Sequence, residues 1–169
     1  MSAHAARFIT AHIGARPGIE TELIDIADLA LATDDAGEAT RQTSLSEKLI
    51  KADGLVIVSP EYNHSFSGLL KHVLDGYLKE YIHKAVGVVG VSAGSFGGSR
   101  GIQDLLPVLR ELGLVTIFWD VYIGPVSKVF DDAGRVLDPA LAGRTDKFLD
   151  ELIWMARTLR YGRETIPLR

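Results

Sequence analysis

Two short, unbroken apolar runs constrain the fold of this chain more than any other feature. Residues 55–59 are mostly β-branched, and residues 85–92 are rich in valine with two embedded glycines. Strands that are apolar on both faces are typical of a parallel sheet covered by helices on both sides. Residues 67–81, between the runs, are amphipathic and carry one apolar stripe: Leu69, Leu70, Val73, Leu74, Tyr77 and Leu78. This order predicts parallel strands joined by a helix.

The rest of the chain continues the alternation of helices and strands. Ser2 is expected to be the N-cap of a first helix, which Gly14 and Pro17-Gly18 end. The remaining predictions are a strand at 19–26, a loop at 28–37, helices at 44–52 and 99–112, a third apolar run at 114–123, a turn at 131–134, and a last helix at 139–159 before a short basic tail. The sequence therefore predicts one domain, residues 1–169, with a three-layer α/β/α, doubly wound parallel sheet.

Composition limits the possible chemistry. The chain has 169 residues, no cysteine and a net charge of −4, with no concentration of cations that would suit nucleic acid. It has no apolar run long enough to cross a bilayer, no signal-peptide core, and no His or carboxylate cluster spaced for a metal. We expect a cytoplasmic protein with neither a nucleic-acid nor a membrane partner.

Polar loops follow the two apolar runs. In an open parallel sheet, ligands bind outside the carboxyl ends of the strands. The loop at 60–68 combines a rigid proline, an aromatic residue and an asparagine, which suits one edge of a flat heteroaromatic ring. The loop at 92–98 has three glycines just before a helix, so its backbone N–H groups can approach the electron-rich pyrimidine edge of a flavin.

The sequence of residues 59–75, SPEYNHSFSGLLKHVLD, resembles the second signature of the NADPH-dependent FMN reductase family, and residues 92–98 resemble its glycine-rich third signature. The resemblance implies a flavodoxin-like fold, non-covalent FMN, NADPH or NADH as electron donor, and a homodimer or homotetramer. It also implies a small-molecule electron acceptor, namely a quinone, azo dye, free flavin or metal oxyanion. By position, the implied cofactor-binding residues are Pro60, Glu61, Tyr62, Asn63, Ser92, Ala93, Gly94, Gly97 and Gly98, with no catalytic side chain.

The amino terminus departs from this family. Its members begin with an apolar strand and a Gly-Ser-x-Arg-x-x-Ser loop that binds the FMN phosphate, whereas only Met1 precedes Ser2 here. Ser2 is placed at the final serine of that loop, which makes it a further cofactor-binding candidate. We therefore expect a sheet without its first strand, and a coding start placed too far downstream is our hypothesis for its cause.

Several alternatives stay open at this stage. The protein is either an enzyme, an electron carrier or other flavin-binding module, or a truncated chain that does not hold FMN. The three glycines of the second loop either approach the ligand or only allow close packing. Arg100 either contacts the phosphate of the nicotinamide cofactor or is a surface or subunit-interface arginine, and His64 is expected to be an ordinary loop residue. Trp119, Tyr122 and Trp154 are expected to pack or form an interface, and the basic tail is expected to be solvated.

Overall fold

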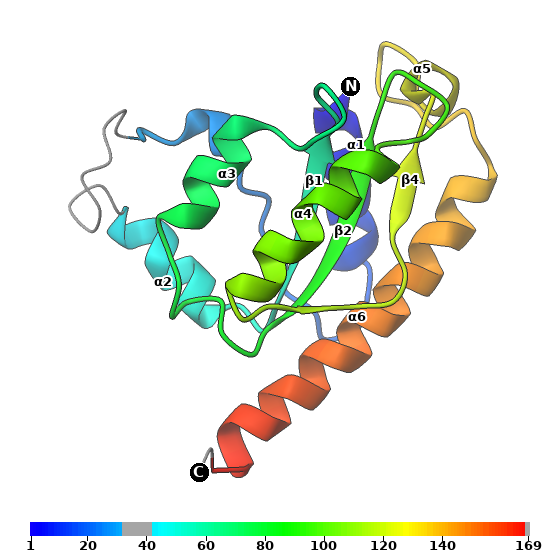
Figure 1. Ribbon diagram of the computed structural model, residues 1–169. Helices are drawn as coiled ribbons and strands as arrows, with labels where there is room; N and C mark the ends of the chain where they lie inside the picture. Colours follow the sequence, from blue (N-terminus) through cyan, green and yellow to red (C-terminus); the bar gives the residue numbers. More distant parts are fainter. Residues whose placement is uncertain (32–41, 168–169) are drawn as a thin grey trace.

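The computed structural model describes residues 1–31 and 42–167 as a parallel β-sheet with helices on both faces (Figure 1). The predicted α/β architecture is confirmed. The elements are α1 (Ser2–Gly14), η1 (Ile26–Asp28), α2 (Thr43–Lys51), β1 (Gly54–Pro60), α3 (Gly68–Asp75), β2 (Ala85–Val91), α4 (Ser99–Glu111), β3 (Val115–Thr116), β4 (Val121–Ile123), α5 (Val126–Val129) and α6 (Ala140–Thr165).

The valine-rich strand β2 is the centre of the sheet. It pairs in parallel with β1 along its whole length, from Gly54 opposite Ala85 to Pro60 opposite Val91. On its other side it pairs in parallel with β3 and then with β4. Every residue of β2 is buried, as expected for a strand that is covered on both faces and paired on both edges.

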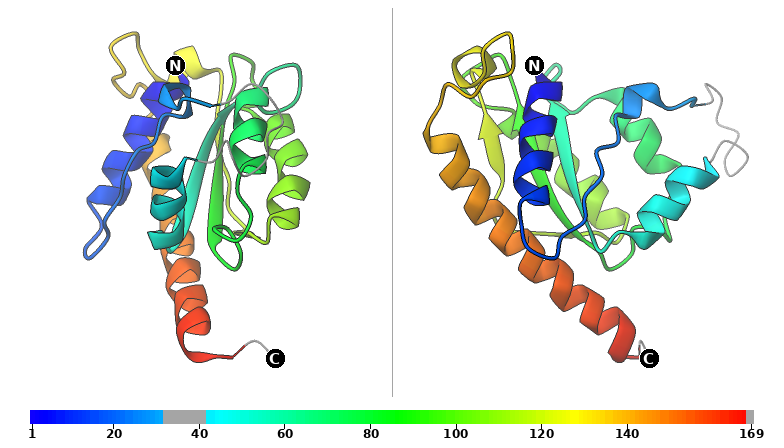
Figure 2. Two further views of the ribbon diagram at one scale, coloured as in Figure 1. Left: turned by 90° about the vertical axis from the view of Figure 1, so that its left-hand side faces the viewer. Right: turned by 180° about the vertical axis from the view of Figure 1, so that it is seen from behind.

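The two faces of the sheet carry separate helical layers (Figure 2). Helices α1 and α6 cover one face, where Ile9 and Phe148 pack with Val89 and Val91. Gly87 of β2 faces this layer, and a side chain there would overlap the Phe148 ring. Helices α2, α3 and α4 cover the other face and pack on apolar side chains that include Val86 and Val88. The alternation of side chains along β2 therefore supplies both cores.

The strand predicted at residues 19–26 is wrong. Residues 19–25 belong to no strand or helix, and a 3₁₀ turn follows at Ile26–Asp28, where the Asp25 carboxylate accepts a hydrogen bond from the Ala27 N–H. An extended segment becomes a strand only where a neighbour shares its hydrogen bonds, and β1 pairs only with β2 among the described residues. The loop predicted at 28–37 falls mostly outside the described residues.

The apolar run at 114–123 does not form one strand. Thr116 pairs with Val86 and Val121 pairs with Val89, so the outer strand uses two more residues than β2 over this stretch. The extra length bulges out of the sheet. The carboxylate of Glu151 in α6 accepts hydrogen bonds from the Phe118 and Trp119 N–H groups, at 3.0 and 3.1 Å, in place of the sheet.

Three helix ends differ from the prediction. Met1, not Ser2, is the N-cap of α1, and it makes no side-chain capping bond. Helix α3 ends at Asp75 instead of residue 81, because a turn follows in which the Glu80 carboxylate accepts a bond from the Leu78 N–H.

The third difference concerns the predicted basic tail: α6 continues to Thr165, so Arg157, Arg160 and Arg163 lie on this helix, and all three are exposed. Arg160 and Arg163 both bind the carboxylate of Asp53, at 3.1 and 2.9 Å, and Arg163 also donates to the His83 carbonyl oxygen. These contacts fix the end of α6 against the start of β1.

Candidate functional site

The two polar loops leave the sheet side by side. The last residues of β1 and β2, Pro60 and Val91, are paired, and the Glu61 N–H donates to the Val91 carbonyl oxygen at 2.8 Å. The Ser92 N–H donates to the Ile123 carbonyl oxygen at the end of β4. The predicted site residues of both loops therefore meet at the carboxyl edge of the sheet, where open α/β folds bind ligands.

The first loop is a tight turn that projects from β1. Tyr62 and Ser65 exchange backbone hydrogen bonds at 2.8 and 3.0 Å across Asn63 and His64. Both central residues have positive φ, 51° and 70°, as a type I′ turn requires, and asparagine and histidine adopt such angles more readily than most residues. The Ser65 hydroxyl donates to Asp104 of α4. The turn thus presents Tyr62 and Asn63, both exposed, at the edge of the sheet.

The second loop contains glycines of two kinds. Gly97 and Gly98 are buried and have positive φ, 61° and 87°. A Cβ at Gly98 would lie 2.6 Å from Gly90 and Val91, and one at Gly97 would lie 2.9 Å from Tyr122. Gly94 is exposed, and a Cβ there would meet only the Ser92 hydroxyl, at 3.5 Å. Close packing therefore accounts for Gly97 and Gly98, whereas Gly94 has room on its outer side.

Arg100, at the start of α4, joins the two loops. Its guanidinium carbon lies 4.3 Å from the centre of the Phe96 ring, a cation–π distance. Its Nη1 is 3.2 Å from His64 Nε2 and 3.9 Å from Glu61 Oε1. Arginine is always a donor, so this Nε2 must be the unprotonated acceptor. Sequence reasoning could not find this set of contacts, because the three partners become neighbours only when the loops fold.

Glu61 is the buried carboxylate of the site. Its side chain is only 9% exposed, and Oε2 has no hydrogen-bond partner among the described residues. An unpaired buried carboxylate oxygen is costly. Arg100 is the one cation within ion-pair distance in the described part of the chain, which makes it the natural group to compensate this charge.

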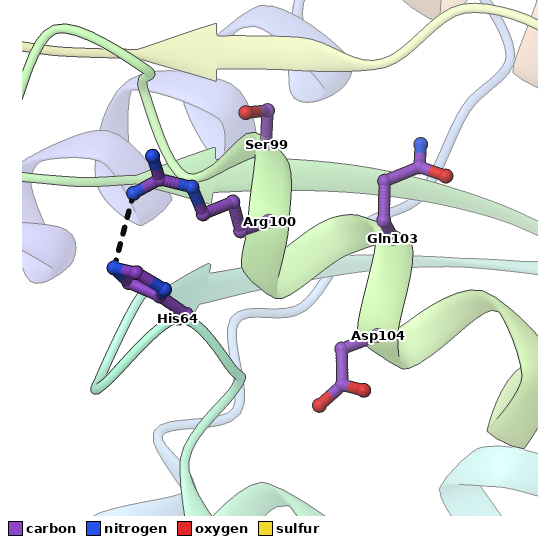
Figure 3. A pocket seen from close by; sticks show the side chains of 5 residues that line it. All are labelled: His64, Ser99, Arg100, Gln103 and Asp104. Atoms are coloured by element: carbon purple, nitrogen blue, oxygen red, sulfur yellow. Dashed lines mark hydrogen bonds between the residues drawn. The ribbon is translucent and has the colours of Figure 1, made fainter.

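A shallow hollow of about 410 Å³ lies beside the first loop (Figure 3). It is lined by His64, Ser99, Arg100, Gln103 and Asp104, so its walls carry charges of both signs. Neither Tyr62 nor Ala93 lines it.

A second polar pair lies at the outer edge of the sheet. The Tyr122 hydroxyl donates to Asp120 at 3.0 Å. Burial, together with the Asp120 charge, raises the pKa of Tyr122 to about 12. Burial also raises the pKa of Asp120, and the hydrogen bond from Tyr122 opposes part of that rise. The backbone of Tyr122 contacts Gly97, so this pair adjoins the second loop.

The model of the NADPH-dependent FMN reductase family matches residues 1–125. The chain belongs to this family. It is 30% identical to an NAD(P)H-dependent FMN reductase of Pseudomonas aeruginosa over 152 residues, which cover 85% of this chain and 82% of that relative. It is also 30% identical to a quinone reductase of Pseudomonas putida over 139 residues, 75% of each chain.

A solved flavoenzyme shares the fold of this chain. FerB, a flavoenzyme NAD(P)H:(acceptor) oxidoreductase from Paracoccus denitrificans, superposes with a TM-score of 0.74 at 24% identity, covering 92% of this chain and 91% of its own. The chain is an FMN-dependent NAD(P)H oxidoreductase, and the cofactors predicted from the sequence, FMN with NADH or NADPH, are confirmed.

The groups present at the sheet edge fit a flavin reductase. The backbone N–H groups of Asn63, Ala93 and Ser95 donate to no acceptor within the described residues, and all three residues are exposed. Unpaired donors in neighbouring loops suit the acceptor-rich edge of an isoalloxazine ring. The amino-terminal end of α1, with Ser2, lies at the same edge of the sheet as both loops (Figures 1 and 2). A helix start favours the negative charge of a phosphate.

Two further observations concern metals and membranes. Among residues 1–31 and 42–167, no group of three or more His, Asp or Glu side chains is arranged to hold a metal ion. No helix in that part of the chain combines the length and apolar character needed to cross a membrane.

Proposed function

We propose that this reductase passes the electrons of NADH or NADPH to a small-molecule acceptor, a quinone, azo dye, free flavin or metal oxyanion, by a ping-pong route. FMN, when bound, supplies the hydride and electron chemistry. The pairing of Pro60 with Val91 supports the proposal most directly, because it sets both loops at one edge of the sheet. The relationship to a quinone reductase supports the quinone among these acceptors.

Each loop has a proposed part in binding. Pro60, Glu61, Tyr62 and Asn63 line one side of the ring and the ribityl chain, with the Asn63 N–H as a donor. Ser92, Ala93 and Gly94 meet the pyrimidine edge, where unpaired N–H groups favour developing negative charge. Gly97 and Gly98 contribute by shaping the loop, since both are packed against neighbouring backbone.

Ser2 is proposed to lie near the phosphate of the cofactor. The start of α1 offers backbone N–H groups, and negative charge is stabilised there. No side-chain acid or base is assigned to the reaction, because the protein's role is positioning and charge stabilisation. The same open face of the site receives the electron donor and then the acceptor, so the donor product must leave first.

The test is a two-stage experiment on the purified chain supplied with FMN. Anaerobic mixing with NADPH, and separately with NADH, is expected to bleach the flavin absorbance, and a quinone added afterwards is expected to restore it. Steady-state rates with both substrates varied are expected to give parallel double-reciprocal lines. Bound flavin that neither nucleotide reduces indicates a flavin-binding module, and a chain that binds no FMN contradicts the proposal altogether.

The protein is also proposed to work as a homo-oligomer, either a dimer or a tetramer. Large exposed apolar side chains on the described surface, such as Phe96, Phe118 and Trp154, support self-association. Sedimentation equilibrium measures the number of chains directly, and a single chain at all concentrations contradicts this part of the proposal.

A further inference from the structure

Four aromatic side chains form an exposed surface on the side of the molecule where α6 meets the bulge between β3 and β4. We call this set, Phe118, Trp119, Trp154 and Tyr161, the aromatic face. The side chains are 80%, 48%, 62% and 65% exposed, respectively. Large exposed apolar patches are uncommon on monomers, and aromatic residues are enriched at protein interfaces.

The aromatic face is held in a fixed shape. The Phe118 and Trp119 rings pack edge to face, with centroids 5.1 Å apart. The Glu151 carboxylate binds both backbone N–H groups of this pair, which ties the bulge to α6. Trp154 follows Glu151 by one helical turn, and Tyr161 follows Trp154 by two turns on the same side. Pre-organised side chains lose little entropy when a partner covers them.

The charges of α6 divide at Trp154. Before it, three acidic residues, Asp146, Asp150 and Glu151, outnumber two basic ones, Arg144 and Lys147; after it, Arg157, Arg160 and Arg163 outnumber Glu164. Asp150 and Arg157 lie about one turn on either side of Trp154, and both are exposed. If a second α6 ran antiparallel across Trp154, Asp150 of each copy would lie opposite Arg157 of the other. Two-fold symmetry therefore makes this pair occur twice in the interface.

We infer that the aromatic face and the exposed side of α6 form an isologous interface with a second copy of this chain. Trp154 lies near the two-fold axis, and the Asp150 of each copy faces the Arg157 of the other. The C-terminal part of α6 extends past the sheet (Figures 1 and 2). The inference rests on the proposed self-association, and it specifies the surface that mediates it.

The expected affinity is modest. Large aromatic side chains bury roughly 150–250 Å² each, so the exposed parts of these four supply about 500 Å² per copy. That area is at the low end for specific interfaces. We therefore expect a reversible association with a dissociation constant of roughly micromolar size.

Complementary charge reversal tests this geometry in the full chain by sedimentation equilibrium. Asp150→Arg and Arg157→Asp each place like charges opposite one another, so each variant alone is expected to weaken this association at least about tenfold. An equimolar mixture is expected to restore it, because each Arg then faces an Asp. Trp154→Ala is expected to weaken association at least about tenfold as well.

Folding is monitored separately by thermal unfolding and circular dichroism, because Asp150 also contacts Arg16 at 3.2 Å. Arg157→Lys is the matched variant that keeps the charge, and it is expected to associate like the wild-type chain. Oligomers that persist unchanged in all three disruptive variants overturn this interface but leave self-association intact. A wild-type chain that is monomeric throughout overturns both. Failure of the mixture to restore what the single variants lose overturns the antiparallel pairing.

Discussion

The guanidinium of Arg100 lies over the Phe96 ring at 4.3 Å and reaches His64 Nε2 at 3.2 Å. One side chain of α4 therefore contacts both loops of the proposed flavin site. Arg100 also lies 3.9 Å from the buried carboxylate of Glu61, so its positive charge compensates the negative charge of that side chain in the first loop.

Replacing Arg100 should loosen the two loops relative to each other. Arg100→Ala is expected to weaken FMN binding about five- to tenfold, because a partly exposed cation–π contact and ion pair contribute about 1 kcal/mol. Arg100→Lys keeps the charge but not the planar group, so its FMN affinity should lie between those of the wild-type chain and Arg100→Ala. FMN fluorescence titration measures the affinity. An unchanged affinity in Arg100→Ala means that Arg100 does not order the loops.

The glycines of the second loop allow a matched comparison. Gly98→Ala should destabilise the fold by about 2–4 kcal/mol, because its Cβ would overlap the β2 backbone at an unfavourable φ. Gly143→Ala is the control: this exposed position within α6 has no atom within 4 Å of the added Cβ, so a gain of about 0.5–1 kcal/mol is expected. Urea unfolding measures both. Equal effects would mean that the packing at Gly98 is not as described.

Gly94 should behave differently from Gly98. Gly94→Val adds a side chain on an exposed loop with only the Ser92 hydroxyl nearby, so unfolding should change by less than about 1 kcal/mol. The same side chain would enter the space proposed for the ring, and FMN affinity should fall by more than about tenfold. Fluorescence titration and urea unfolding of one variant separate the two effects. Normal flavin binding by this variant would exclude Gly94 from the site.

Asp120 gives a pH-dependent prediction. Its pKa is raised in the folded protein by burial, so the folded state binds a proton more readily than the unfolded chain. Ionised Asp120 therefore costs stability above the raised pKa, and this cost disappears as the pH falls below about 3.8, the unfolded value. Asp120→Asn should be more stable than wild type near neutral pH, by under about 1 kcal/mol for a group screened by solvent, and equal to it in acid.

The control for that experiment is Asp131→Asn. Hydrogen bonds from the backbone and side chain of Arg135 lower the pKa of Asp131, so its ionised form stabilises the fold. That contribution is present above the unfolded value and is lost as the pH falls through the lowered pKa. The wild-type chain should thus be more stable than Asp131→Asn at neutral pH. Unfolding curves across a pH series that show the same sign for both variants would contradict the assignment.

The sequence predicted the parts of the fold whose signal is local. Residues 55–59 and 85–92 carry continuous apolar runs, and they form β1 and β2 with nearly the predicted bounds. The strand predicted at residues 19–26 does not form, because a strand depends on a neighbouring strand as well as on its own residues. The apolar run at 114–123 does not form a single strand, because Glu151, far along the chain, accepts hydrogen bonds from the Phe118 and Trp119 N–H groups.

The candidate site was predictable to the same extent. Pro60 and Ser92 could be placed at one edge, because the carboxyl ends of parallel strands meet there. The contacts of Arg100 with Phe96, His64 and Glu61 were not predictable, since they join residues up to 39 positions apart through folded loops. The buried packing of Gly97 and Gly98 also depends on how close β2 and β4 come to the second loop.

The central claim is that the first and second loops hold one FMN between them. Equilibrium titration of FMN with the purified chain, followed by flavin fluorescence, tests it most directly. The account predicts saturable quenching at one FMN per chain, which Gly94→Val weakens and the exposed control Gly143→Ala leaves unchanged. A folded chain that binds no FMN, or one whose affinity is indifferent to Gly94→Val, would contradict it.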